Sequence, residues 1–175
     1  MKQTSTLLLC SALALSACKE DQAKAPPPPV PLTQEALSFF CQMNVAEHGG
    51  PKGQIHLDGF PAPLFFAQVR DLVAYLKSPE RDAQIVGVYV SDMGAAATWA
   101  QPGIENWIPA DTAHFVVGAK VAGGMGAQEI VPFLSSEDAV AFASKWGGTI
   151  EILDTIPDGA ALGPADLTQN LESPT

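Results

Sequence analysis

Two sulfur-bearing side chains, Cys41 and Met43, stand two residues apart in this sequence. A thiolate and a thioether form a soft ligand set, which favours Cu(I) over hard cations such as Mg²⁺ or Ca²⁺. The segment carries no helical pattern, and in an extended backbone residues i and i+2 face the same side, with Cα atoms about 6.5–7 Å apart. We therefore expect both sulfurs to converge on one soft metal ion. The alternative is an inert thiol packed beside Phe40, with Met43 filling a gap in the core.

A third sulfur donor, Met125, lies in the glycine-rich segment Gly123-Gly124-Met125-Gly126. A thioether on such a loop is poorly placed to fill a core and well placed to reach a ligand. Met93, which follows an apolar strand, and His56, on a short strand, are the other candidate donors, and each also fits a packing role. The sequence leaves the third metal ligand open among these three residues.

Three other kinds of function are alternatives to a soft-metal site: a zinc site, a thiol enzyme and a metal-free scaffold. A structural zinc site needs four nitrogen or sulfur ligands, whereas the chain offers one cysteine and the scattered His48, His56 and His114. A thiol enzyme would use Cys41 as nucleophile with a histidine base, but no nucleophile signature surrounds Cys41. A metal-free envelope scaffold would bind a partner through its acidic surface.

The N-terminus has the features of a bacterial lipoprotein signal peptide. Lys2 gives a weakly positive start, and the apolar run 7–15 is too short to span a bilayer. The run ends in Leu15-Ser16-Ala17-Cys18, which resembles a lipobox, so Cys18 is expected to be lipidated. Lys19 after this cysteine favours the outer membrane. These features predict a lipid-anchored protein on the periplasmic face of a bacterial membrane, with Cys41 as the one thiol of its folded domain.

We expect four parts along the chain: a signal peptide over 1–17, a lipidated proline-rich tether over 18–31, one domain over 32–156, and a loosely ordered tail over 157–175. The tether contains Pro26-Pro27-Pro28-Pro29, which favours polyproline II and a semi-rigid spacer. The formal net charge of −10 argues against binding of nucleic acid or anionic lipid headgroups by charge attraction.

The folded part predicts the same order of elements twice. The first half has two short strands, an amphipathic helix that ends before Ser78-Pro79, and an apolar strand. The second half has two strands, a helix that begins at Ser135 and ends at Gly147-Gly148, and a final strand. The expected strands are 54–57, 63–66, 85–90, 115–121, 129–133 and 149–153, and the expected helices are 69–76 and 136–146.

Aligning the two halves suggests an internal duplication. It places aromatic, acidic and apolar residues at equivalent positions: Phe66 with Phe133, Asp71 with Asp138, Val73 with Val140, and Tyr75 with Phe142. The sequence therefore predicts an α+β fold built from two related ββαβ units, at about 39–92 and 107–154, packed as a small two-lobed domain. Chance similarity of two α+β halves is the alternative.

These residues together resemble one known family, the NosL lipoprotein copper chaperones, over about 39–153. The resemblance rests on an ordered set of segments: the lipobox ending at Cys18, Cys41-Gln42-Met43, Gln54-Ile55-His56-Leu57, Val88-Tyr89-Val90-Ser91-Asp92, Gly124-Met125-Gly126, Ile130-Val131-Pro132-Phe133, Phe142-Ala143 and Gly147-Gly148. Family members often have glycine where this chain has Gln42, and some carry a second cysteine that this chain lacks.

The resemblance implies a non-enzymatic protein that binds Cu(I) in the periplasm. It implies delivery of copper to apo nitrous oxide reductase and its membrane maturation complex, for the CuZ centre. Carried over to this sequence, the metal ligands are Cys41, Met43 and Met125. Because the chain has a single thiol in this domain, the thioether and imidazole donors gain importance.

Overall fold

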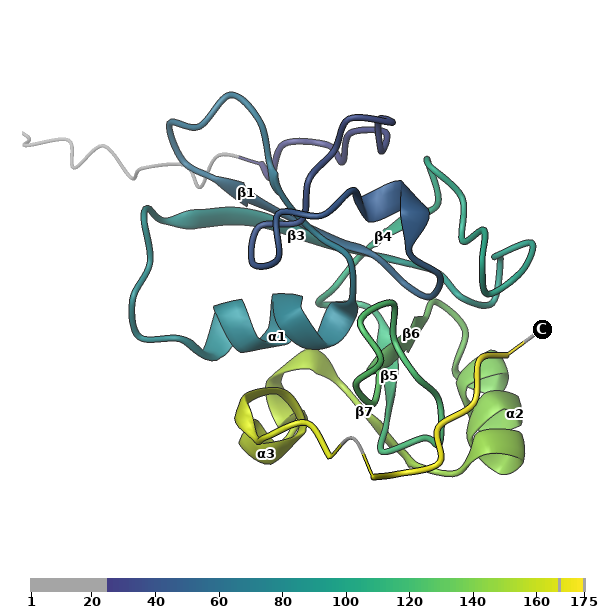
Figure 1. Cartoon of the computed structure of the whole chain (residues 1–175). Helices are drawn as coiled ribbons and strands as arrows, with labels where there is room; N and C mark the ends of the chain where they lie inside the picture. Colours follow the sequence, from purple (N-terminus) through teal and green to yellow (C-terminus); the bar gives the residue numbers. More distant parts are fainter. Residues whose placement is uncertain (1–24, 167, 175) are drawn as a thin grey trace, which may run out of the picture.

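The computed structural model describes residues 25–166 and 168–174, and it places them in two sheets and three α-helices (Figure 1). The signal peptide and Cys18 lie outside the described residues. The first sheet has the strand order β2-β1-β3-β4, and every neighbouring pair is antiparallel. Its strands are β1 (Gly53–Leu57), β2 (Leu64–Phe66), β3 (Ile85–Ser91) and β4 (Trp107–Pro109).

The second sheet repeats the three-strand core of the first. Its order is β6-β5-β7, again antiparallel throughout, with β5 (His114–Val117), β6 (Val131–Phe133) and β7 (Thr149–Glu151). In each unit the first strand is central, and the helix follows the second strand. The helices are α1 (Val69–Lys77) and α2 (Ser136–Trp146). The expectation of an α+β fold with two ββαβ units is confirmed.

The two units differ in how deeply their helices are buried. Val73 on α1 is buried, whereas the aligned Val140 on α2 is 53% exposed. The cause is the position of α1, which packs against β1 and β2 and contacts the short α3 (Asp158–Leu162). In Figure 1 α1 lies between the first sheet and α3, while α2 lies at the outer edge of the second unit.

One apolar core joins the units. Ile55, Leu72 and Val73 of the first unit pack with Phe115 and Ile130 of the second. A smaller core lies under α2 and combines Trp99 with the second sheet. Burial of large apolar side chains stabilises a fold by about 1.5–3 kcal/mol each, so the shared core holds the units together.

The boundaries between the parts differ from the sequence-based expectation. β4, which we placed at the start of the second unit, pairs with β3 and so extends the first sheet. The tail contains α3, and Glu172 pairs with Val121 through hydrogen bonds to Lys120 and Ala122. The proline-rich segment lies against the first sheet, where the hydroxyl of Tyr89 donates to the carbonyl of Pro27 over 2.7 Å.

Two 3-10 turns complete the described chain, η1 (Val45–Glu47) and η2 (Leu153–Thr155). The side chain of Asn44 caps η1 by accepting from the Ala46 amide. The Ser135 hydroxyl caps α2 by accepting from the Asp138 amide, as expected from the sequence. Within the described ranges, no helix has the length and apolar character needed to cross a bilayer.

Candidate metal site

Cys41 lies at the tip of a short hairpin. Leu37 and Asn44 form an antiparallel bridge, and the Ser38 amide donates to the Met43 carbonyl over 2.9 Å. The Gln42 amide donates back to the Ser38 carbonyl over 2.8 Å, which closes the turn. The extended backbone that we expected for this segment is therefore wrong. A turn presents Cys41 and Met43 at one end of the hairpin instead of on one side of a strand.

Gln42, between the two sulfur residues, has a left-handed backbone with φ = 56°. This conformation is costly for most L-residues and freely open to glycine. Its side-chain amide supports the turn by donating to the carbonyl of Phe39 over 2.8 Å. The observed backbone gives a physical reason why glycine suits this position, and why glutamine can replace it.

Two aromatic rings anchor the hairpin beside α1. Phe39 meets Tyr75 edge-on, with ring centroids 5.4 Å apart, and Phe40 meets Phe66 edge-on at 5.8 Å. The free thiol of Cys41 is only partly buried, and Met43 is 46% exposed. The structure does not place either residue in the interior, as the interpretation of an inert core thiol requires.

Met125 lies on a tight loop of the second unit. The Gly123 amide donates to the Ala127 carbonyl, and the Gly126 amide to that of Gly123, which closes the loop. Gly126 has φ = 80°, a backbone that favours glycine. The Met125 side chain is 38% exposed, so its thioether is available at the surface.

The hairpin and the Met125 loop rest on the same short connection between β2 and α1. The Ala67 amide donates to the Ser38 hydroxyl over 3.3 Å. The Met125 amide donates to Oε1 of Gln68 over 3.3 Å. Gly124 approaches closely enough that an added Cβ would lie 3.3 Å from the Ala67 carbonyl oxygen. Ser38 and Met125, 87 positions apart in sequence, therefore contact two consecutive residues.

His48 is a candidate donor that the sequence did not single out. Its Nδ1 lies 3.0 Å from the Gly124 carbonyl, next to Met125, and its buried Nε2 has no hydrogen-bond partner among the described residues. When Nδ1 carries the proton and donates to Gly124, Nε2 keeps a free lone pair, which is the form that binds metals. No local pattern marks His48, because its contact with the loop spans 76 residues.

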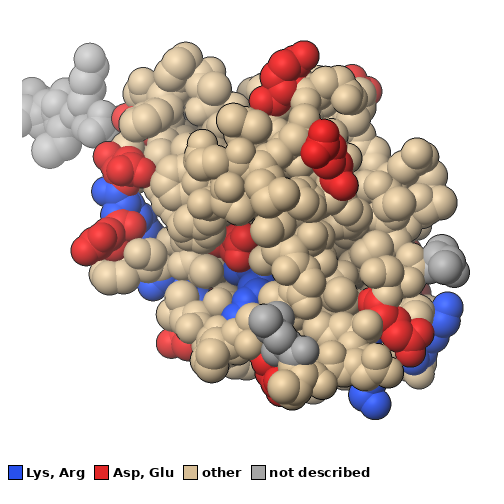
Figure 2. Space-filling model, in the orientation of Figure 1, with Lys and Arg blue, Asp and Glu red and all other residues tan. Residues whose placement is uncertain are grey.

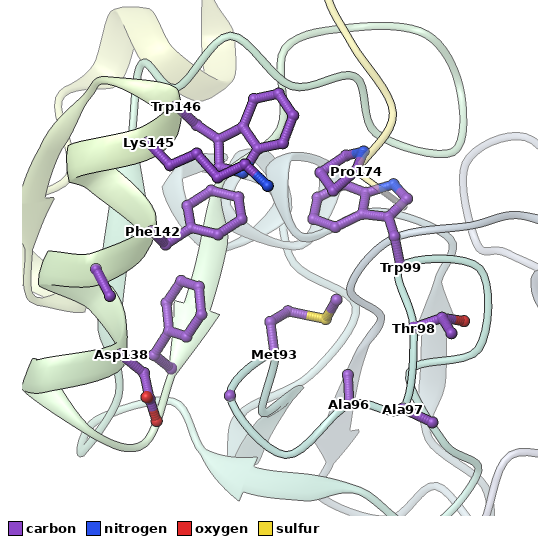
Figure 3. Close-up of a pocket in the computed structure, with 13 residues that line it drawn as sticks. Met93, Ala96, Ala97, Thr98, Trp99, Asp138, Phe142, Lys145, Trp146 and Pro174 are labelled. Atoms are coloured by element: carbon purple, nitrogen blue, oxygen red, sulfur yellow. The ribbon is translucent and has the colours of Figure 1, made fainter.

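The other two candidate donors face different surroundings. Nε2 of His56 lies 2.9 Å from Oε1 of Gln54, and burial lowers the pKa of this imidazole. Met93 lines a pocket of about 400 Å³ between Trp99 and Phe142, shown in Figure 3. Figure 3 shows its thioether among aromatic and small side chains. Neither residue contacts the hairpin or the Met125 loop through a hydrogen bond in the described chain.

A buried ionisable pair lies beneath the Met125 loop. Nζ of Lys52 donates to the carbonyls of Gly49 and Ala67 over 3.0 and 3.1 Å. Oε1 of Glu129 accepts from the Arg70 amide at the start of α1 and from the amide of its neighbour Ile130. Its Oε2 has no hydrogen-bond partner in residues 25–166 and 168–174. Burial raises the pKa of Glu129 to about 8 and lowers that of Lys52 to about 8. Through these hydrogen bonds, Lys52 and Glu129 connect the segments around Gly49, Ala67 and Arg70 beneath the Met125 loop.

The candidate metal donors Cys41, Met43, Met125 and His48 offer sulfur and imidazole nitrogen atoms. Among residues 25–166 and 168–174, no three His, Cys, Asp or Glu side chains are grouped so that they could hold a metal ion. Figure 2 shows that much of one face is uncharged, with acidic side chains scattered over it. The candidate donors singled out above are sulfur and imidazole groups, which favour a soft or borderline ion.

These features define a small α+β protein of two ββαβ units, with candidate soft-metal ligands on a hairpin of the first unit and a loop of the second. Residues 29–161 match the family described as NosL. The chain belongs to the NosL family, and the resemblance drawn from the sequence is confirmed.

Several relatives of this chain carry names that describe their role. One is the copper-binding lipoprotein NosL of Achromobacter cycloclastes, 54% identical over 91% of this chain and 83% of the relative. Another is the copper-binding lipoprotein NosL of Stutzerimonas stutzeri, 29% identical over 82% of this chain and 74% of the relative. The crystal structure of the copper chaperone NosL from Shewanella denitrificans superposes with a TM-score of 0.71, at 33% identity over 76% of this chain and 99% of that one. These names describe chaperones and binding proteins, not enzymes.

Proposed function

We propose that this protein is a periplasmic Cu(I) metallochaperone anchored by a lipid on Cys18. The observation that supports the proposal is that Ser38, at the base of the Cys41 hairpin, contacts Ala67, while Met125 contacts the next residue, Gln68. On this proposal, a thiol from the first unit and a thioether from the second serve one copper site. The names of the relatives, copper-binding lipoprotein and copper chaperone, support the same function.

Cys41, Met43 and Met125 are the proposed ligands. The thiolate of Cys41 supplies the strong bond, and the two thioethers complete a low-coordinate Cu(I) site. His48 is a fourth candidate, because its buried Nε2 has no hydrogen-bond partner within the part of the chain that the structure describes. Since Met43 and Met125 are both well exposed, the site faces solvent on one side. An incoming donor can approach from that side.

Copper transfer then proceeds by ligand exchange, without a change in oxidation state. A donor from the recipient binds the exposed Cu(I), a shared-copper intermediate forms, and the neutral thioethers leave before the thiolate. The exposed apolar side chains around Cys41, Leu37 and Phe40, give the recipient a surface to pack against. The proposed recipient is apo nitrous oxide reductase with its membrane maturation complex, and the copper is destined for the CuZ centre.

Anaerobic Cu(I) titration against a chelator tests the proposal. The protein is expected to compete for about one equivalent of Cu(I), and Cys41→Ser should lose at least a hundredfold in affinity. Cys18→Ser serves as the matched control, because it removes the other cysteine left after signal-peptide cleavage and leaves the domain intact. Near-wild-type affinity in Cys41→Ser would overturn the assignment and favour a metal-free scaffold.

The destination is tested separately. Apo nitrous oxide reductase is mixed with the copper-loaded protein and with sulfide, which the copper–sulfide CuZ cluster also requires, and the optical bands of its copper centres are followed. Appearance of CuZ absorption with the wild type and not with Cys41→Ser is the expected result. Transfer to a different centre, with CuZ unchanged, would contradict the proposed destination while leaving copper binding in place.

A further inference from the structure

The loop that joins β1 to β2 exposes an unbroken uncharged run at its tip. Gly59, Phe60, Pro61 and Ala62 are all exposed, and Phe60 retains 50% of its accessible surface. No charged residue occurs between Gly59 and Val69. Several consecutive exposed apolar residues are unfavourable on a soluble surface unless a partner covers them. We therefore expect another surface to cover the tip of this loop.

The proline-rich segment is fixed to the sheet next to this loop. The Gln54 side chain pairs with both backbone groups of Val30, accepting from its amide and donating to its carbonyl over 3.0 Å each. Tyr89 holds Pro27, and His56 holds the Gln54 amide oxygen. The spacer that we expected up to Pro31 is thus part of the folded domain from about Pro26 onward.

The chain leaves the domain beside Phe60. Ala25 and Pro27 line a small cavity of about 190 Å³ together with Leu57, Phe60 and other residues of that loop. Figure 1 shows the β1–β2 loop on the side of the molecule where the described chain begins. The exit point and the exposed apolar tip are therefore neighbours.

The linker from this exit to the lipid anchor is short. Only residues 19–25 separate Cys18 from the docked prolines. The eight residue steps from Cys18 to Pro26 span at most about 29 Å when fully extended. The exit, and the loop beside it, therefore stay within about 30 Å of the membrane surface whenever Cys18 carries its lipid.

We propose that the β1–β2 loop inserts Phe60 into the bilayer interface and gives the anchored domain a fixed membrane-facing side. Because the short linker holds the loop close to the bilayer, even a weak contact between the loop and lipid forms for much of the time. An uncharged tip on an acidic protein suits apolar insertion into zwitterionic lipid and not charge attraction. The proposal rests on the lipid anchor and is independent of copper binding.

Fluorescence quenching by lipids with brominated acyl chains tests the contact. The lipidated protein is reconstituted in phosphatidylcholine vesicles as the wild type, as Phe60→Trp and as Leu134→Trp. Leu134 is a matched control, because it is equally exposed but lies before α2 in the second unit. The tryptophan added at position 60 should be quenched at least twofold more than the one at position 134, above the common background of the native tryptophans.

Two further samples distinguish insertion into lipid from other causes of quenching: an unlipidated variant, and vesicles that also contain a membrane protein. Unlipidated Cys18→Ser/Phe60→Trp should lose the quenching, since one loop without the anchor binds vesicles weakly. Equal quenching at positions 60 and 134 would overturn the proposal, as would a mass spectrum showing no acyl group on Cys18. Quenching at position 60 that requires a co-reconstituted membrane protein would assign the loop to a protein partner and would equally overturn it. Unchanged Cu(I) affinity of Phe60→Trp confirms that the fold is intact.

Discussion

The backbone amide of Met125 donates a hydrogen bond to Oε1 of Gln68 over 3.3 Å, and this bond links the two units at the candidate metal site. Gln68 is almost fully buried, and its Nε2 is fixed by Asp71 at 3.0 Å. Asp71 lies in the first turn of α1, so the position of the Met125 loop depends on the N-terminus of that helix.

Removing the Gln68 side chain should weaken copper binding without touching a ligand. A neutral hydrogen bond contributes about 0.5–1.5 kcal/mol, and 1.4 kcal/mol corresponds to a factor of ten in affinity. We therefore expect Gln68→Ala to lower Cu(I) affinity about three- to tenfold in chelator competition. Gln84→Ala, at an exposed position away from the loop, is the control and should bind like the wild type.

The choice of the third ligand can be tested with two equivalent substitutions. Met125→Leu removes an exposed thioether at the site, whereas Met93→Leu exchanges one half-buried apolar side chain for another in the aromatic pocket. We expect at least a tenfold loss of Cu(I) affinity for Met125→Leu and less than twofold for Met93→Leu. A volume-conserving exchange should also keep the stability change of Met93→Leu below about 1.5 kcal/mol. The opposite order of affinities would move the site toward Met93.

The turn at Gln42 predicts an unusual tolerance for glycine. Glycine adopts the observed φ of 56° without steric cost, so Gln42→Gly should keep Cu(I) affinity within about threefold. A β-branched residue is strained there, and Gln42→Val should lower the free energy of unfolding by about 1–2 kcal/mol. Urea unfolding and copper competition on both variants check this. Equal behaviour of glycine and valine would show that the left-handed turn is unimportant.

Glu129 should give the protein a characteristic dependence of stability on pH. Burial raises its pKa from 4.5 to about 8, so between these values the unfolded chain releases a proton that the folded protein keeps. The free energy of unfolding therefore falls as pH rises from about 4.5 to 8. Glu129→Gln does not ionise in either state and should lack this fall, as measured by urea unfolding at pH 5, 6, 7 and 8. Parallel curves for the two proteins would contradict the assignment.

Much of the fold was predictable because its signals are local. The apolar spacing of Val69, Leu72, Val73 and Leu76 identified α1, and Ser135 identified the start of α2. The duplication was visible for the same reason, since equivalent strands end in Phe66 and Phe133. The alignment of the two halves could not show the apolar core that the units share. That core depends on which face of α1 packs against the second unit, and this is set by the tertiary structure.

The site was predictable only in its residue types. Cys41 and Met43 were recognisable from their chemistry, but the left-handed turn between them has no signal in a sequence that places glutamine there. His48, Gln68 and Glu129 reach the Met125 loop through contacts that span many residues or depend on the packing of α1. Such contacts follow from the fold and not from spacing.

The apolar core that crosses from Ile55 and Val73 to Phe115 and Ile130 has a consequence for the release of cargo. Opening the units like a hinge would expose this core to water, at a cost of several kilocalories per mole. The proposed copper ligands, in contrast, lie at the surface, on a hairpin tip and a glycine-rich loop, where Met43 and Met125 are exposed. Metal would then leave through small, sequential movements of surface loops, while the scaffold beneath them stays closed.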